Sequence, residues 1–379
     1  MNRLAVVAWE TATVVGPNLG HPVVGPADLV AEATRTGLPD GAPPVTLAVS
    51  GGLLVWPWCV DAAGDLAPDA TLTRPPVAVL DDVATAQDWL WALYGRDAAL
   101  AVEAAADAPD LRATPGQEWL PAVAARFAFG RWLSAWWPAS TTDGIPALDP
   151  DALRAELEPL IARLDLLLDG AEPPLPGVAT ARRTDRYALA AGTAQDGPPP
   201  AVGVSVSTGV GGTRWSDLPA GWVDASGRAV SWRLLQDVGH WSLRVRAAAG
   251  PVVATREARL VAEASGRRVE LRPGSDSFGW CWLGEATGTE LGPVPERVRV
   301  HLPGFSPPLG SQDADPPVRG ARPSEASGGV DGQGEEPWQE SARRLARARL
   351  TAVGSPPDRG PTVTRPWQAE RAASADDDD

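Results

Sequence analysis

The feature that most constrains the fold is an alternation of apolar and polar residues within residues 185–305. It is clearest at residues 241–246 (WSLRVR) and 297–302 (RVRVHL). A period of two places successive side chains on opposite faces of a β-strand, so that one face is buried and the other is wet. Turn sequences such as residues 224–227 (DASG) separate the alternating runs. Short alternating strands with a turn every ~8–12 residues predict an antiparallel β-sandwich.

Residues 1–80 predict a mixed segment that is rich in strands. Apolar runs at 45–49 and 53–60 flank the turn residues Ser50, Gly51 and Gly52, which is typical of a β-hairpin. Shorter patterns predict a strand near the N-terminus and a helix from Pro26 to Thr36.

Residues 81–170 predict a helical segment that packs against residues 1–80. Asp82, Thr114 and Asp149 each precede apolar residues that are spaced three to four apart, as expected of helix N-caps. The third of these helices should kink at Pro159, because proline removes one backbone hydrogen bond. Proline and glycine follow, and residues 171–184 are interpreted as a linker to the sandwich.

The last segment, residues 306–379, predicts a disordered C-terminal tail. Pro, Gly, Ser, Asp and Glu dominate it, and such a composition buries too little apolar surface to offset the ordering entropy of ~1–2 kcal/mol per residue. One island at 338–350 places Trp338 and Leu345 on one helical face. We interpret it as a possible amphipathic helix that docks on its own chain or on a partner.

Together these segments predict an α+β multidomain protein. A mixed strand and helical N-terminal region precedes the sandwich, whose general look is immunoglobulin-like or carrier-type, and the disordered tail follows. A likeness at the level of the fold implies no function.

Composition excludes several kinds of chemistry. All 33 basic residues are Arg, which indicates a GC-rich bacterial genome and excludes lysine Schiff bases and a phosphate-loop lysine. The net charge of −15 disfavours nucleic acid as a partner. With 2 Cys and 3 His, neither a disulfide framework nor a metal site is expected, and no cofactor is indicated. The sequence has no recognisable leader and no apolar run of ~18–20 residues, so we expect a cytoplasmic protein without a membrane segment.

The loop 138–144 is a candidate ligand site, because it follows two Trp residues and joins two apolar helices. Loops that rigid elements hold often carry function, whereas the turn propensity of Ser, Thr and Asp explains the same residues without any function. The polar side chains that it offers are Ser140, Thr141, Thr142 and Asp143.

The polar side of the predicted sandwich is a second candidate surface. If its strands are neighbours, their arginines form a face that suits carboxylates or an acidic partner. Glu263, Glu270 and Glu296 are able to neutralise that face by cross-strand pairing, which makes an ordinary mixed surface an equal alternative. The arginines proposed as contacts are Arg244, Arg246, Arg297 and Arg299.

Two weaker motifs bear on nucleotide binding and catalysis. Residues 205–213 are rich in Gly, Ser and Thr, but no helix start and no lysine follow, so we interpret them as a flexible loop. His240 is the best placed general base, yet no paired nucleophile accompanies it.

The sequence therefore favours a non-enzymatic interaction or adaptor protein of a bacterial multi-protein system, which binds a protein partner through the β-domain and the tail. One alternative is a hydrolase-like enzyme with its site near residues 138–144 or His240. Another is a small-molecule binding module that uses some of the 17 Trp side chains as stacking walls.

Overall fold

A computed structural model gives the fold of the chain. It describes residues 5–7, 42–80, 82–103, 114–168, 204–252, 258–276, 279–290, 293–305, 337–353 and 362–375. The chain divides into two compact units that do not follow one another along the sequence. Unit 1 comprises Met1–Trp137, Leu148–Pro176 and Pro337–Asp379, and unit 2 comprises Pro138–Ala147 and Gly177–Glu336. The two segments of unit 2 thus interrupt the sequence of unit 1 at two places, which the linear series of predicted domains did not foresee.

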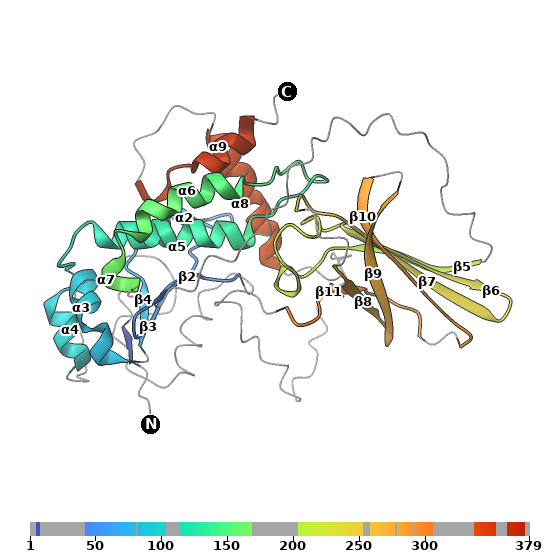
Figure 1. Cartoon of the computed structure of the whole chain (residues 1–379), viewed down its shortest axis with the longest axis horizontal. Coiled ribbons are helices and arrows are strands. Elements are labelled where there is room, and N and C mark those ends of the chain that lie inside the picture. The colour runs from blue at the N-terminus through green and yellow to red at the C-terminus, as the bar shows by residue number, and fades with distance from the viewer. Residues whose placement is uncertain are drawn as a thin grey trace. The chain divides into compact units, whose positions relative to one another are not determined.

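Unit 1 contains a four-stranded antiparallel sheet in the order β1-β4-β3-β2 (Figure 1). Its strands are β1 (Ala5–Val7), β2 (Val45–Val49), β3 (Gly52–Trp56) and β4 (Val77–Leu80). The predicted hairpin is confirmed as β2 and β3. Its second strand is shorter than expected and ends at Trp56, because Pro57 follows and has no N–H for the ladder.

Helices form the rest of unit 1. They are α2 (Pro68–Leu72), α3 (Val83–Tyr94), α4 (Arg96–Glu103), α5 (Leu120–Trp136), α6 (Pro150–Ile161) and α7 (Asp165–Leu168). Two predicted N-caps are confirmed. Asp82 accepts hydrogen bonds from the amides of Ala84 and Thr85, at 3.0 and 3.2 Å. Asp149 caps α6 in the same way, at 2.9 and 3.3 Å. The predicted helix at residues 26–36 lies outside the described residues.

The second predicted helix begins six residues later than expected, at Leu120 instead of Thr114. The amide of Thr114 donates to Tyr94 O at 2.9 Å, and the amide of Gln117 donates to Ala92 O at 3.1 Å. These donors thus satisfy carbonyl groups at the C-terminal end of α3, so the segment forms a turn before α5 starts.

The third predicted helix is divided in two. Helix α6 ends at Ile161, two residues after Pro159, and the four-residue α7 follows from Asp165. The proline therefore lies in the last turn and marks the end of the helix instead of a kink.

The prediction of a disordered tail is wrong for two segments that complete unit 1. Helices α8 (Pro337–Val353) and α9 (Gln368–Ala375) pack on each other, and the 3-10 turn Thr362–Thr364 between them packs on α5. Trp367 is fully buried, and its ring lies against Gly130 of α5, where a Cβ atom would come within 2.9 Å of it. Residues 306–336 and 354–361 lie outside the described residues.

Unit 2 is built on one seven-stranded antiparallel sheet in the order β11-β8-β9-β10-β7-β6-β5. The strands are β5 (Val204–Gly211), β6 (Val230–Asp237), β7 (His240–Ala248), β8 (Leu260–Ala264), β9 (Arg267–Asp276), β10 (Gly279–Gly288) and β11 (Arg299–His301). The antiparallel character and the alternation are confirmed. The described strands form a single curled sheet, a half-barrel, and a two-sheet sandwich of the immunoglobulin-like or carrier type is not confirmed.

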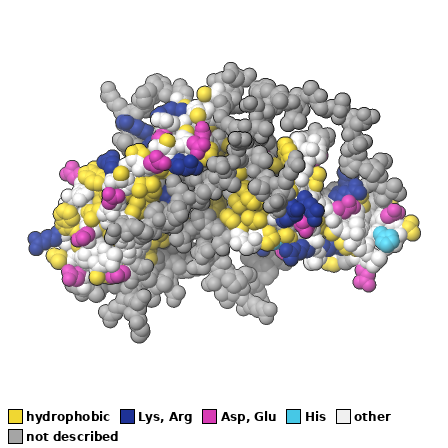
Figure 2. Space-filling view, in the orientation of Figure 1, with side chains coloured by type: hydrophobic (Ala, Val, Ile, Leu, Met, Phe, Trp, Pro, Cys, Tyr) yellow, Lys and Arg dark blue, Asp and Glu magenta, His cyan; other side chains and the backbone are white. Residues whose placement is uncertain are grey.

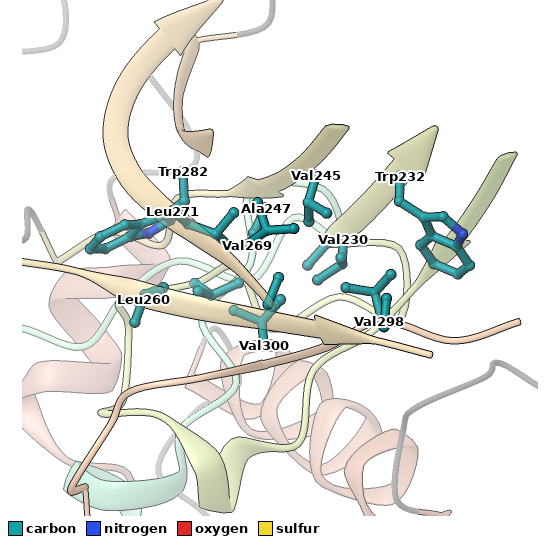
Figure 3. Packing of buried hydrophobic residues seen from close by; sticks show 14 of the residues in the cluster. Val230, Trp232, Val245, Ala247, Leu260, Val269, Leu271, Trp282, Val298 and Val300 are labelled. Atoms are coloured by element: carbon teal, nitrogen blue, oxygen red, sulfur yellow. The ribbon is translucent and has the colours of Figure 1, made fainter. Parts of the chain in front are cut away.

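The curl lets one sheet enclose its own core. Figure 3 shows Val298 and Val300 facing Val230 and Val245 across the cluster of buried side chains. Within the sheet, a glycine also makes room for a large side chain on the neighbouring strand. At Gly209 an added Cβ atom would lie 2.0 Å from the ring of its cross-strand partner Trp232.

None of the described helices is both long enough and apolar enough to cross a membrane.

Candidate functional site

The polar loop predicted from residues 138–144 belongs to unit 2 and is organised around one carboxylate, that of Asp224. The backbones of Ser140 and Ile145 pair in antiparallel fashion across the loop, through two reciprocal hydrogen bonds of 2.8 Å. The Ser140 hydroxyl donates to Asp224 Oδ1 at 2.8 Å. The amide and hydroxyl of Thr141 donate to Oδ2 at 2.8 and 3.0 Å, and the amide of Thr142 donates to the same oxygen at 3.4 Å.

Asp224 is completely buried, and Ser140 is 1% exposed. A fifth donor, the amide of Ser226, reaches Asp224 Oδ1 at 2.9 Å. A buried carboxylate is stable only when such donors surround it. Both oxygens are engaged, as is the hydroxyl of Ser140, which also accepts from the amide of Asp143 at 2.9 Å. The arrangement therefore fixes the loop onto unit 2 and leaves the Ser140 and Thr141 hydroxyls engaged within the protein.

Sequence reasoning selected the loop but missed Asp224. The local signal was present, because the bond from the Ser226 amide to the side chain of Asp224 is an Asx turn, which matches the predicted turn at 224–227. The contact with residues 83 and 84 positions earlier in the chain had no local signal.

The predicted arginine face is divided between strands β7 and β11, which are four positions apart in the sheet, and is largely neutralised by acids. Arg244 Nε lies 3.1 Å from Glu285 Oε1, and the guanidinium of Arg246 pairs with Asp276. Arg299 lies on β11 at one edge of the sheet, far in strand order from β7, and its guanidinium forms two hydrogen bonds of 2.8 Å with Asp217.

These pairs favour the mixed-surface interpretation over a single basic patch. Figure 2 shows basic and acidic side chains interspersed on the visible face of unit 2. Arg297 is exposed, and its neighbour Glu296 is exposed as well.

Strand β5 occupies the other edge of the sheet, where its one neighbour among the described strands is β6 (Figure 1). The glycine-rich run at 205–213, interpreted from sequence as a flexible loop, lies largely in this strand. Val204 is 76% exposed and Val210 is 55% exposed. The strand contains no charged residue and no proline, and it has one register shift between Ser205 and Ser207.

His240 is the first residue of β7 and is exposed, with Asp237 as its cross-strand partner in the β6–β7 hairpin. His21 lies outside the described residues. His301 lies 3.9 Å from Glu263 on the neighbouring strand. Within the described residues, neither His240 nor His301 forms a hydrogen bond or ion pair with the loop 138–144.

Trp338 and Leu345, predicted as partner contacts, are buried within unit 1, with exposures of 2% and 7%. The ring of Trp338 packs edge-on against Trp136 of α5 at a centroid distance of 5.7 Å. The island therefore docks on its own chain. It extends from Pro337 to Val353, somewhat beyond the predicted residues 338–350.

Both cysteines are free, and they lie in different units. Burial raises the pKa of Cys281 to about 11, and the negative charge of Asp276 adds to that effect while Arg246 opposes it. The thiol is thus kept protonated, and a protonated thiol is a poor nucleophile.

We expect Cys281 to resist alkylation by iodoacetamide at pH 8 in the native protein and to react after unfolding. Mass spectrometry of tryptic peptides measures both states, with the partly exposed Cys59 as the internal comparison. Equal modification of the two cysteines in the native protein would contradict the protected environment of Cys281.

Among the described residues, no group of three or more His, Cys, Asp or Glu side chains is arranged to hold a metal ion. Fold and site thus define an α+β protein in which a half-barrel unit interrupts a mixed helical unit. Comparison of the chain with protein-family models, with curated proteins and with solved structures found no match.

Proposed function

We propose that the protein binds a partner protein without catalysing a reaction, and that strand β5 of unit 2 is its binding edge. The observation that carries this proposal is the exposed, uncharged edge of the seven-stranded sheet. An edge strand presents unpaired N–H and C=O groups, and proteins usually guard such edges with charges, prolines or bulges. Of these devices, the bulge near Ser205 is the one that β5 carries.

The regular part of the edge runs from Ser207 to Gly211, in one-to-one register with β6. A partner segment that adds as an eighth strand gains backbone hydrogen bonds along this stretch, which is the mode of recognition known as β-augmentation. The exposed side chain of Val210 adds an apolar contact on one face.

The same observations weaken the two alternatives. The hydroxyls of Ser140 and Thr141, which a hydrolase-like site would use, already bond to Asp224. A Trp-lined ligand site finds little support, because Trp222 and Trp282 stack on each other at a centroid distance of 5.9 Å and belong to the core of unit 2.

Val210→Lys is expected to abolish partner capture while leaving the fold intact. A lysine on an edge strand disfavours the addition of another strand, whereas its side chain remains in water in the free protein. Val238→Lys is the matched control, because Val238 is 93% exposed in the β6–β7 turn and lies away from the edge.

The measurement is affinity capture from cells of the source organism with the full-length wild type and both variants. We expect proteins that the wild type and Val238→Lys retain and that Val210→Lys loses, at equal melting temperatures. If all three forms retain the same proteins, the edge is not the binding surface.

A further inference from the structure

If β5 binds a partner strand, as the proposed function requires, Arg233 of β6 indicates the chemistry of that strand. The cross-strand partners of Arg233 are Thr208 on β5 and Arg244 on β7. Arg244 is paired with Glu285 at 3.1 Å. Within the described parts of the chain, no acidic side chain lies within ion-pair distance of Arg233, and its side chain is exposed.

Thr208, Arg233, Arg244 and Glu285 are thus successive cross-strand partners on β5, β6, β7 and β10. This row of side chains contains two positive charges and one negative charge. Like charges that face each other across two strands are destabilising. One further carboxylate would balance the charge of this row. The neutral Thr208 occupies the position between Arg233 and the open edge.

A strand added to β5 supplies the next position of that row. Two inter-strand spacings of ~4.8 Å place its backbone about 10 Å from that of Arg233. An arginine and a glutamate side chain together span this distance over the small side chain of Thr208. The ion pair forms on the face of the sheet that points away from the core, because Trp232, next in sequence to Arg233, points into the core.

We propose that β5 receives an extended acidic segment of a partner protein, with a Glu or Asp beside Thr208 that pairs with Arg233. A second copy of this chain is a poorer occupant. Strand β5 has no acidic residue, so pairing of two β5 strands adds no carboxylate and brings a second Arg233 to the same surface.

The test is selection of a phage-displayed library of random octapeptides on the immobilised full-length protein. Wild type is compared with Arg233→Glu, with Val210→Lys and with Arg268→Glu. Arg268 is the matched control, because it is an exposed arginine on β9, three strands removed from β6 in the sheet.

We expect the wild type and Arg268→Glu to select peptides that are rich in β-branched residues and have Asp or Glu at one position. Arg233→Glu should select Lys or Arg at that position, and Val210→Lys should select neither class. In a selected peptide, replacing the acid by its amide should weaken binding by about threefold, the scale of an exposed cross-strand ion pair.

The outcomes separate the two proposals. Peptides that Val210→Lys loses, but that show no acidic preference and no change with Arg233→Glu, overturn the acidic partner and leave the edge as the binding surface. Peptides that bind Val210→Lys as well as the wild type overturn both proposals, as does the absence of any selected peptide.

Discussion

Glu370→Ala is expected to lower the free energy of unfolding of unit 1 by about 3–5 kcal/mol. Glu370 of α9 is fully buried, and its carboxylate forms a two-pronged pair with Arg349 of α8, whose side chain is 8% exposed. One prong joins Arg349 Nη2 to Glu370 Oε2 at 2.8 Å. The same oxygen accepts from the amide of Trp367 at 2.8 Å. Removing the acid leaves the guanidinium buried without its counter-charge, which is the costly step.

The cost should come from the unpaired charge and not from the loss of attraction alone. The double variant Arg349→Met with Glu370→Leu is therefore expected to be more stable than Glu370→Ala, because apolar residues of similar size replace the pair. The exposed pair of Arg154 and Asp151, at 2.7 Å, is the control, and Arg154→Ala should cost less than about 1 kcal/mol.

Hydrogen exchange with mass spectrometry measures this effect separately in each unit. A loss of 3 kcal/mol corresponds to a drop in amide protection of about 100-fold, because each 1.4 kcal/mol is tenfold. The drop should extend to α5, since Arg126 of α5 donates to Arg365 O at 3.0 Å and lies 3.9 Å from the ring of Trp367. Unchanged protection of α5 in Glu370→Ala would show that the C-terminal helices do not stabilise unit 1.

The sequence predicted correctly those features that depend on residues close together in the chain, such as two helix N-caps. The caps at Asp82 and Asp149 depend on amides two or three residues away, so the sequence contains the whole interaction. The predicted start of α5 at Thr114 was wrong, because the amide of Thr114 donates to the carbonyl of Tyr94, twenty residues earlier. No local sequence pattern reveals such a partner.

The C-terminal tail was predicted to be disordered because its composition was averaged over all of residues 306–379. Over 74 residues the apolar content is low, yet two short segments bury Trp338 and Trp367 against a helix that is formed some two hundred residues earlier. The spacing in residues 338–350 predicted the helix, and the partner surface that stabilises it lay outside any local window.

The curl of unit 2 was missed for a similar reason. Alternation predicts strands with one buried face, but it does not distinguish two stacked sheets from one sheet that folds over itself. The choice depends on contacts between strands that are far apart in the sheet, such as those that bring Val298 and Val300 to face Val230 and Val245 in one buried cluster.

Asp224→Ala is expected to destabilise unit 2 by about 3–4 kcal/mol, because it removes the shared acceptor of buried donors. The donors come from Ser140, Thr141, Thr142 and Ser226. Asp224→Asn should cost less stability than Asp224→Ala. The side-chain carbonyl oxygen of Asn still accepts from some of the donors, whereas its NH₂ group faces the others.

Asp237→Ala is the matched control for this substitution. Asp237 is exposed, and its carboxylate accepts from the amide of the adjacent Val238 at 2.7 Å, so its loss should cost less than about 1 kcal/mol. The reporters are the amides of Ser140 and Ile145, which bond reciprocally at 2.8 Å. If Asp224 holds the loop, these amides exchange rapidly in Asp224→Ala before the sheet itself opens. If they stay protected while Asp224→Ala unfolds with the stability of Asp237→Ala, the carboxylate is not what fixes the loop. Loss of protection confined to the loop, without global destabilisation, would instead assign Asp224 to loop placement alone and lower its expected contribution to the stability of unit 2.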